Sequence, residues 1–157
     1  MKIRKATAKD IPRIQQLYRQ LDEHHVCLLP HVFQNVDGNA RPDSLIDQWI
    51  EEQDADYLLA EKDDIVVGFV NVRKSAYPKH PMFRAREVVL IENAVVDKPY
   101  RGKGIGTALF DAAVTWAKNW GVVQIQTNVW NENAGARDFY LAQGFCPTTM
   151  NMELNIE

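Results

Sequence analysis

Apolar residues recur along this chain with two different periods, and each period predicts one kind of element. Spacings of three and four residues place apolar side chains on one side of four segments, as in amphipathic helices. These predicted helices cover residues 7–23, 42–53, 107–120 and 134–143. Thr7 is the expected cap of the first helix, and Asp10 lies near the positive end of that helix. Gly144 follows the last helix, as is common at a helix C-terminus.

Other runs are continuously apolar or alternate with period two, as strands do. These predicted strands cover residues 2–6, 57–61, 65–73, 88–96, 122–130 and 150–156. The charged residues 62–64 between the second and third predict an antiparallel hairpin. The run 88–96 is apolar almost throughout, which is typical of a strand buried on both faces. The strands on either side of the helix 107–120 should be parallel neighbours.

The order of these elements predicts a mixed sheet with helices packed on it, in the α/β or α+β class. A length of 157 residues suits a single domain over residues 1–157. Proline and glycine mark two long connections, 24–41 and 75–86. Long connections in compact domains are often functional, so the segment from His24 to Arg41 is of interest.

Composition and charge argue against several classes of partner. With 46% hydrophobic and 25% charged residues, the chain is an ordinary globular protein. A net charge of −3 disfavours a nucleic-acid surface, because neutralising phosphates takes a concentrated excess of Lys and Arg. No run is long enough to span a membrane, and the start lacks the apolar run of a signal peptide. Cys27 and Cys146 match no metal or redox spacing. We therefore expect a cytoplasmic protein without nucleic-acid, membrane or metal partners.

The strongest chemical signal lies between the predicted strand 88–96 and the helix that follows. Its residues are Arg101, Gly102, Lys103, Gly104, Ile105 and Gly106. Glycine allows positive φ and close approach of the backbone, so successive N–H groups and the positive helix end can bind an anion. A dinucleotide fingerprint would need glycine in place of Thr107, and a P-loop would need a different glycine-lysine spacing. The remaining pattern is Arg/Gln-x-x-Gly-x-Gly/Ala.

This loop and a second block resemble the GNAT superfamily of acetyl-CoA-dependent N-acetyltransferases. The first block runs from Val96 to Leu109, and the second reads Asn133-x-x-Ala136-x-x-Phe139-Tyr140-x-x-x-Gly144-Phe145. The resemblance implies a mixed, mostly antiparallel sheet of six to seven strands, flanked by about four helices. It also implies that the central parallel strands splay apart, which leaves unpaired backbone beside the ligand.

The resemblance further implies acetyl-CoA as co-substrate and names the residues that would contact it. Amides of residues 101–106 would hold the pyrophosphate, and the Val95 and Val96 backbone would contact the pantetheine arm and acetyl group. Asn133 matches a family position that contacts CoA, although it could equally cap the next helix. Arg137 could meet a phosphate or simply lie on an exposed helix face. The implied cofactor-binding set is Val95, Val96, Arg101, Gly102, Lys103, Gly104, Ile105, Gly106, Thr107, Asn133 and Arg137.

Two residues are candidates for proton transfer. Tyr140 stands where the family commonly carries the general acid, although Phe139 and Tyr140 could equally be core aromatics. Glu92 shares its side of a regular strand with Leu90 and Ala94, so we expect burial to raise its pKa, as suits a base. The alternative for Glu92 is an ion pair with a buried Arg or Lys.

The predicted function is direct transfer of an acetyl group to a primary amine in a ternary complex. A small amine such as a polyamine, amino acid or aminoglycoside is the expected acceptor. A protein lysine or N-terminus, and a catalytically inactive acyl-CoA-binding sensor, are the alternatives. Family members are commonly homodimers, and alternating Met150, Met152, Leu154 and Ile156 could add a strand to a partner's sheet.

Overall fold

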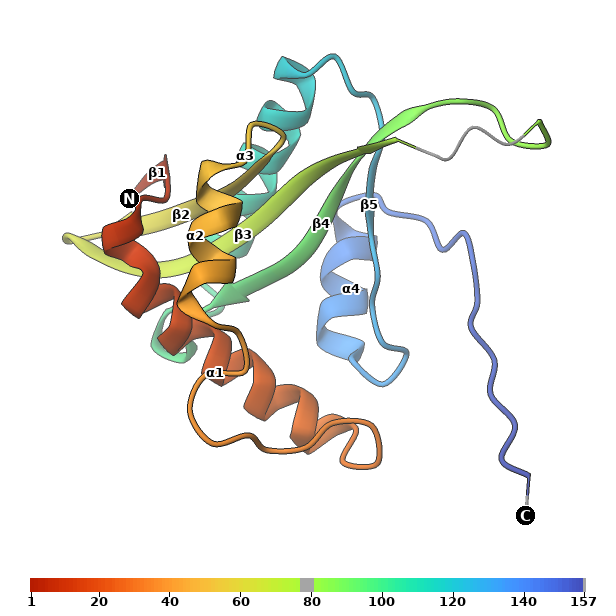
Figure 1. Ribbon diagram of the computed structural model, residues 1–157, viewed down its shortest axis with the longest axis horizontal. Coiled ribbons are helices and arrows are strands. Elements are labelled where there is room, and N and C mark those ends of the chain that lie inside the picture. Colours follow the sequence, from red (N-terminus) through yellow and green to blue (C-terminus); the bar gives the residue numbers. More distant parts are fainter. Residues whose placement is uncertain (77–80, 157) are drawn as a thin grey trace.

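The computed structural model describes residues 1–76 and 81–156 and contains one five-stranded sheet. Its order is β1-β2-β3-β4-β5, antiparallel except for the parallel pair β4–β5 (Figure 1). The strands are β1 Lys2–Lys5, β2 Ala55–Lys62, β3 Ile65–Ala76, β4 Glu87–Val96 and β5 Ile125–Thr127. The mixed, mostly antiparallel sheet is confirmed, with five strands instead of six or seven.

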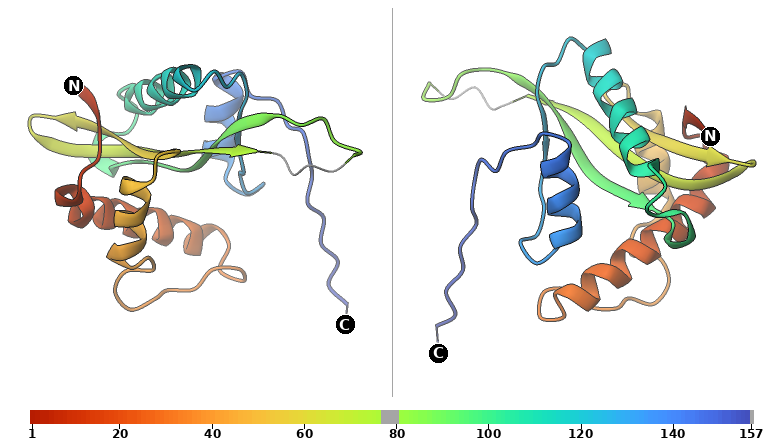
Figure 2. Two further views of the ribbon diagram at one scale, coloured as in Figure 1. Left: turned by 45° about the horizontal axis from the view of Figure 1, so that its top comes forward. Right: turned by 180° about the vertical axis from the view of Figure 1, so that it is seen from behind.

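Four helices cover the two faces of the sheet, as predicted. They are α1 Ile11–Leu28, α2 Asp43–Glu51, α3 Ile105–Asn119 and α4 Ala134–Ala142, with short 3-10 turns η1 Ala8–Asp10 and η2 Lys98–Tyr100. Helices α1 and α2 lie on one face, and α3 and α4 lie on the other (Figure 2). The sheet is therefore the middle of three layers.

Helix α1 is longer than predicted and includes His24 and His25, which were assigned to the connection. The helix continues because Val26 and Leu28 are half-buried and extend its apolar side. It ends at Leu28, and Leu29, the residue before Pro30, leaves the helical region with φ −136° and ψ 63°. The predicted end near Glu23 was therefore wrong by about one turn.

The start of α1 is held by charge. The Thr7 N–H donates a 2.8 Å hydrogen bond to the Asp10 carboxylate, as in a capping box. The Arg4 guanidinium of β1 donates two hydrogen bonds, of 2.9 and 2.8 Å, to the same carboxylate. This pairing lowers the pKa of Asp10 to about 2, against the opposing effect of burial.

Two hydrophobic clusters fill the space on either side of the sheet. The α3-side cluster joins β2, β3 and β4 to α3 and α4, with Val72, Ile91, Leu109, Trp116 and Tyr140 among its buried members. The α1-side cluster joins the opposite face to α1 and α2, with Ile14, Tyr18, Leu59, Phe69 and Val95 among its buried members. Each helix layer thus has its own core.

The C-terminal third departs most from the predicted elements. Strand β5 has three residues, where residues 122–130 were predicted, because it pairs with β4 over a short stretch only. The predicted strand 150–156 was wrong, since residues 145–156 form neither helix nor strand. This tail lies away from the body (Figures 1 and 2), where it meets no neighbouring strand. Part of the predicted connection 75–86 lies outside the described residues.

Candidate active site

The parallel strands β4 and β5 part after three residue pairs. Val89, Leu90 and Ile91 lie opposite Ile125, Gln126 and Thr127. The Thr127 hydroxyl donates a 3.0 Å hydrogen bond to the Ile91 carbonyl at the point of separation. Beyond it, no strand in the described part of the chain pairs with this edge of β4, which stays open to Val96. The splayed parallel strands implied by the resemblance are present.

A β-bulge interrupts β4 beside this open edge. Asn71 of β3 lies opposite Asn93, and the next residue, Val72, lies opposite Ile91, which leaves Glu92 without a counterpart. The Asn71 side-chain oxygen accepts a 2.8 Å bond from the Asn93 N–H and so holds the bulge. One extra residue reverses the side to which every later residue points.

The bulge determines which backbone groups face the open edge. Asp97 donates its N–H to the Val67 carbonyl at 2.9 Å, so residue 97 faces β3. Successive residues in an antiparallel pair alternate between the two edges, so the Val95 backbone also faces β3, while Ala94 and Val96 face the open side. The Val96 carbonyl indeed accepts a 2.8 Å bond from Arg101 Nε outside the sheet. Ala94, which sequence reasoning missed, therefore joins Val96 at this edge.

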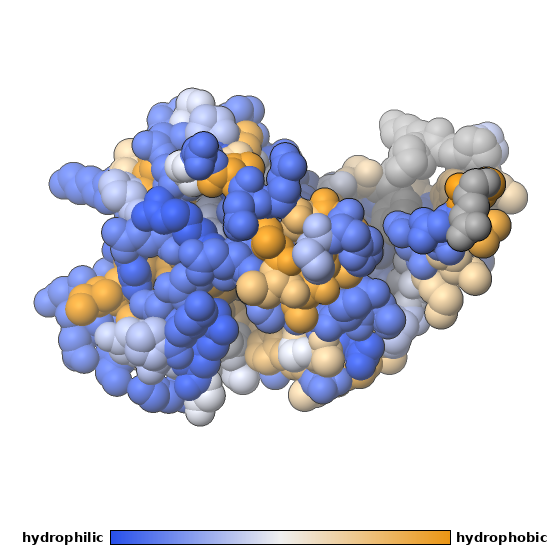
Figure 3. All heavy atoms as spheres, turned by 90° about the horizontal axis from the view of Figure 1, so that it is seen from below, coloured by the Kyte–Doolittle hydropathy of each residue, from blue (hydrophilic) through white to orange (hydrophobic). Residues whose placement is uncertain are grey.

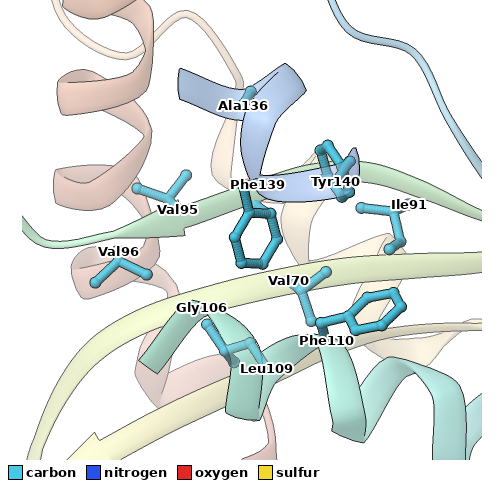
Figure 4. Close-up of a pocket in the computed structure, with 11 residues that line it drawn as sticks. Val70, Ile91, Val95, Val96, Gly106, Leu109, Phe110, Ala136, Phe139 and Tyr140 are labelled. Carbon is cyan, nitrogen blue, oxygen red and sulfur yellow. The ribbon is translucent and has the colours of Figure 1, made fainter. Parts of the chain in front are cut away.

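An apolar cavity of about 190 Å³ lies between β4 and the helices α3 and α4 (Figure 4). Residues from four elements line it, namely β3, β4, α3 and α4. They are Ile91, Ala94, Val95 and Val96 of β4, Gly106, Leu109 and Phe110 of α3, and Ala136, Phe139 and Tyr140 of α4, with Val70 beneath. Its lining suits an uncharged chain or an acyl group, because a charge would lose its hydration there.

Gly106 brings α3 close to α4 at this cavity. A Cβ on Gly106 would lie 3.3 Å from the Phe139 ring, which is tighter than ordinary contact. Glycine therefore lets the Phe139 side chain point between β4 and α3 (Figure 4). The sequence predicted Gly106 as a backbone donor, and the structure adds this packing role.

The loop before α3 has the left-handed backbone that its glycines allow. Gly102 and Gly104 have φ of 70° and 77°, and Gly104 is the N-cap residue immediately before α3. No atom lies within 4 Å of the place where a Cβ on either would stand, so the outer side of the loop is open. Thr107 is also exposed, whereas Ile105 is buried against the core.

The two cations of the loop bind backbone carbonyls. Arg101 reaches Val96, and the Lys103 ammonium donates a 2.9 Å bond to the Pro99 carbonyl. Both residues are exposed. These contacts hold the loop against the end of β4, while the helix N-terminus beside them carries partial positive charge. An anion-binding role for the two cations stays a prediction.

The start of α4 has a simpler structural explanation. The Asn133 side-chain oxygen accepts a 3.1 Å bond from the Ala136 N–H, so its capping role is confirmed. Arg137 is exposed and donates a 3.0 Å bond to the Asn131 carbonyl. Their contacts with CoA stay predictions.

Tyr140 lines the cavity and is 9% exposed. Burial raises the pKa of its phenol above the usual value of 10, and a hydrogen bond with Thr127 acts in the opposite direction. The phenol is therefore protonated at neutral pH and can donate a proton. Tyr140 packs in the core and also faces the cavity, so the two readings of the sequence are compatible. Thr127 was missed, and its only signal was its place on the strand after α3.

Glu92 lies in the bulge, between the cavity-lining residues Ile91 and Ala94 in sequence. Its side chain is exposed, so the expectation of burial was wrong. The error follows from the bulge, because the argument assumed a regular strand alternation. No ion pair joins Glu92 to any described residue, so the alternative of a buried pair fails too.

The end of β4 is tied to α1 on the other side of the sheet. Arg13 donates one hydrogen bond of 2.5 Å to the Asp97 carboxylate, and Gln20 donates another of 2.8 Å. Burial acts to raise the pKa of Asp97, but these donors outweigh it and the pKa is lowered. Sequence reasoning missed this hydrogen-bond network. It fixes Asp97, the residue that follows β4 on the way to the glycine loop.

An aromatic bridge spans from α1 to the loop before α4. The His25 and Phe33 rings stack at 5.0 Å, and Phe33 meets Trp130 edge to face at 5.4 Å. The connection after α1 therefore contacts the segment that follows β5. Burial lowers the pKa of His25, so its imidazole is more readily neutral. His25, Phe33 and Trp130 are called the aromatic bridge below.

In the described residues, no group of three His, Cys, Asp or Glu side chains lies so that it could hold a metal ion. Among the same residues, no helix is both long enough and apolar enough to cross a membrane.

Comparisons of sequence relate this chain to known proteins. An uncharacterised N-acetyltransferase of Methanocaldococcus jannaschii is 35% identical over 107 residues, which is 62% of this chain. The L-ornithine N5-acetyltransferase of Arabidopsis thaliana is 34% identical over 101 residues, or 63% of this chain. Each alignment covers only 42% of the relative's own length.

Comparisons of structure agree. A crystal structure of a Bacillus halodurans protein variant superimposes with a TM-score of 0.95 at 25% identity, covering 100% of both chains. The aminoglycoside 6'-N-acetyltransferase of Acinetobacter haemolyticus shares the fold, with a TM-score of 0.77 at 18% identity over 100% of this chain and 99% of that one. The sequence also matches the Acetyltransferase (GNAT) family over residues 14–145. This chain belongs to the GNAT acetyltransferase family.

Proposed function

We propose that the protein transfers an acetyl group from acetyl-CoA directly to the primary amine of a small molecule, in a ternary complex. The observation that carries this proposal is the open edge of β4 beside an apolar cavity that also holds the Tyr140 side chain. An extended acyl chain can bond to that edge as a strand would, while its end enters the cavity.

The residues around the glycine loop suit the other end of acetyl-CoA. The amides of residues 101–106 and the start of α3 present N–H donors on an open surface, which favours the pyrophosphate. Arg101, Lys103 and Arg137 would add charge, while Thr107 and Asn133 would add polar contacts. The Val96 backbone, with that of Ala94, would bond the pantetheine arm, and the Val95 side chain would line its path.

The transfer needs three groups, and the chain offers a candidate for each. The amine nitrogen attacks the thioester carbonyl, whose oxygen becomes negative and accepts a bond from an open-edge N–H of β4. The carbon–sulfur bond then breaks, and Tyr140 gives its proton to the departing thiolate. The proton lost by the amine passes to Glu92, directly or through water. The products are the amide and free CoA.

The acceptor site would lie between the open edge of β4 and the aromatic bridge. The Arabidopsis relative is named for acetylating ornithine, which supports a small amine. The exposed Glu92 carboxylate would attract the acceptor amine while the amine is still protonated and cationic. We also propose a cytoplasmic location, since Cys27 and Cys146 are exposed free thiols that suit a reducing compartment.

Thiol release from acetyl-CoA tests the proposal. The purified protein is mixed with acetyl-CoA and a panel of amines: polyamines, basic amino acids, aminoglycosides and a lysine peptide. We expect thiol release with at least one small amine and acetylation of that amine by mass spectrometry. Tight CoA binding without thiol release would identify a sensor, and activity confined to the lysine peptide would identify a protein acetyltransferase.

A further inference from the structure

One carboxylate lies between helix α1 and the glycine loop, and no step of the proposed transfer uses it. It belongs to Asp97, the residue between β4 and the turn η2. The underside of the molecule, where α1 lies in Figure 1, is largely hydrophilic in its left part (Figure 3), as expected of charges in water. Asp97 differs from such charges because it is only 8% exposed. A buried carboxylate has to be paired, so its partners indicate its role.

Both oxygens of this carboxylate are held by α1. Arg13 Nη2 donates a hydrogen bond of 2.5 Å to Asp97 Oδ2, and Gln20 Nε2 donates one of 2.8 Å to Asp97 Oδ1. Arg13 and Gln20 are seven residues apart in the helix, which places them on the same side of it. One side of α1 therefore fixes the position of the Asp97 side chain.

The same two α1 side chains also hold the backbone on either side of this contact. Arg13 Nε donates a 2.8 Å bond to the Val66 carbonyl of β3. Gln20 Oε1 accepts a 3.2 Å bond from the Lys98 N–H at the start of η2. Asp97 is thus the point at which α1, β3 and η2 are joined.

The turn η2 connects Asp97 to the glycine loop. The Asp97 carbonyl accepts a 2.8 Å bond from the Tyr100 N–H, and the Lys98 carbonyl accepts one of 3.4 Å from the Arg101 N–H. Arg101 begins the loop, and its side chain bonds to the Val96 carbonyl on the other side of Asp97. This stretch of backbone has little freedom of its own, so a shift at Asp97 displaces the loop.

The charge of Asp97 needs a partner for a second reason. A carboxylate close in sequence to an anion-binding loop repels the anion, unless a cation neutralises it. The Arg13 guanidinium supplies that cation. A second ion pair, Lys98 with Glu23 at 3.9 Å, also joins η2 to α1, but its side chains are 62 and 64% exposed, so it contributes little. Arg13 is therefore the principal charge partner.

We propose that Asp97 is a positioning residue for the CoA donor. Held by Arg13 and Gln20, it keeps η2 and the glycine loop in the conformation that binds the pyrophosphate. This inference rests on the proposed function, since it takes CoA as the ligand of the loop. The Asp97 carboxylate faces α1, so it acts through the backbone that follows it. A loop that adopts its binding conformation about a tenth of the time binds roughly tenfold more weakly.

The first test is CoA binding to the full chain by isothermal titration calorimetry. We expect Asp97→Ala to raise the Kd of CoA roughly tenfold. The matched control is Asp10→Ala, because Asp10 is 9% exposed and pairs with Arg4 of edge strand β1, which β2 and β3 separate from β4. Asp10→Ala should lower stability and leave the Kd unchanged. Equal Kd values for Asp97→Ala and the wild type would overturn the proposal alone, whereas a wild type that binds no CoA would overturn the proposed function with it.

The second test separates positioning from a general loss of structure. S-acetylpantetheine carries the same thioester as acetyl-CoA but lacks the pyrophosphate and the nucleotide. With the amine that the thiol-release panel identifies, we expect Asp97→Ala to lower kcat/KM roughly tenfold for acetyl-CoA and hardly at all for S-acetylpantetheine. The loss should lie in KM, with kcat at saturating acetyl-CoA nearly unchanged. Equal losses with the two donors would refute a positioning role.

Two further variants keep the proposal testable if Asp97→Ala folds poorly. Gln20→Ala removes one bond to the carboxylate and leaves the Arg13 pair, so we expect a smaller rise in the Kd of CoA. Arg13→Ala combined with Asp97→Ala removes the pair as a unit, and its Kd should be no higher than that of Arg13→Ala alone. An unchanged Kd in Gln20→Ala, or effects of Arg13→Ala and Asp97→Ala that simply multiply, would contradict the proposal.

Discussion

The Thr127 hydroxyl donates its hydrogen bond to the Ile91 carbonyl at the point where β4 and β5 separate. The same side chain is the hydrogen-bond partner of Tyr140. One threonine thus connects the open edge of β4 to the proposed acid. The position of the Tyr140 phenol is set by the strand junction itself.

Replacing Tyr140 with Phe removes the proposed acid and keeps the ring. We expect Tyr140→Phe to lower kcat by roughly 10²- to 10⁴-fold, with acetyl-CoA affinity little changed. Because its pKa is raised, loss of the phenol proton should not reduce the wild-type rate between about pH 7 and 9. The control is Tyr57→Phe, which removes a buried hydroxyl on the α1 side, bonded to Tyr18 at 2.9 Å. Full turnover by Tyr140→Phe would refute the role.

Glu92→Gln tests the proposed base. A base acts without its proton, so we expect kcat/KM to fall by about 10²-fold at neutral pH and the acid-side loss of rate to disappear. Glu87→Gln is the matched control, because Glu87 lies in the same strand, is exposed and pairs with Lys74 away from the cavity. An unchanged pH–rate profile in Glu92→Gln would assign the proton to another acceptor.

Gly104→Ala tests the left-handed backbone at the start of α3. An L side chain at φ 77° is strained, so we expect a loss of roughly 1–2 kcal/mol in unfolding free energy and a higher KM for acetyl-CoA. Gly135→Ala is the control, since Gly135 lies in the first turn of α4 with ordinary φ and space for a Cβ. Thermal unfolding and donor titration measure the two effects. Equal behaviour of the two variants would contradict the prediction.

Asp10→Asn tests the charge pairing at the start of α1. The pKa of Asp10 is about 2 in the fold and 3.8 without it, so the carboxylate stabilises the fold above pH 4. That contribution is lost as pH falls toward 2. We expect Asp10→Asn to cost roughly 1–2 kcal/mol at pH 7 and almost nothing near pH 2, measured by urea unfolding. If Asp10→Asn loses the same unfolding free energy at pH 7 and near pH 2, the loss comes from packing and not from the charge of Asp10.

Phe33→Ala tests the aromatic bridge as part of the acceptor site. Losing the contacts with His25 and Trp130 should raise the acceptor KM by roughly three- to tenfold. The KM for acetyl-CoA should hardly change, since the bridge lies away from the glycine loop. Val36→Ala, at an exposed position of the same connection, is the control. Equal changes in both KM values would mean a general loss of structure.

Much of the fold followed from local patterns. The hairpin at residues 62–64 was predictable because the charged turn residues separate two apolar runs, and Asp63 and Asp64 indeed adopt positive φ. The glycine loop was predictable because only glycine takes the conformation of residues 102 and 104 at no cost. In both places the residue itself carries the physical constraint.

The misses arose where pairing between distant segments decides the outcome. One unpaired residue in β4 turned Glu92 outward and gave Ala94 the place assigned to Val95 at the open edge. Nothing in residues 88–96 marks that bulge, because it depends on the register with β3 and on Asn71. The predicted strand 150–156 was wrong for a similar reason. Its alternation indicates which residues would share one side of a strand, but it does not indicate with which strand the tail would pair.

The two hydrophobic clusters have separate consequences for engineering. Of the residues that line the cavity, Val95 alone belongs to the α1-side cluster as the described residues define it. Substitutions around Ile14, Leu17 and Ile46 could therefore raise heat resistance with little effect on turnover. The α3-side cluster offers no such freedom, because the residues that hold α3 and α4 together also line the cavity of the proposed active site. Directed evolution for durability should begin on the α1 side, and evolution for new acyl donors on the other.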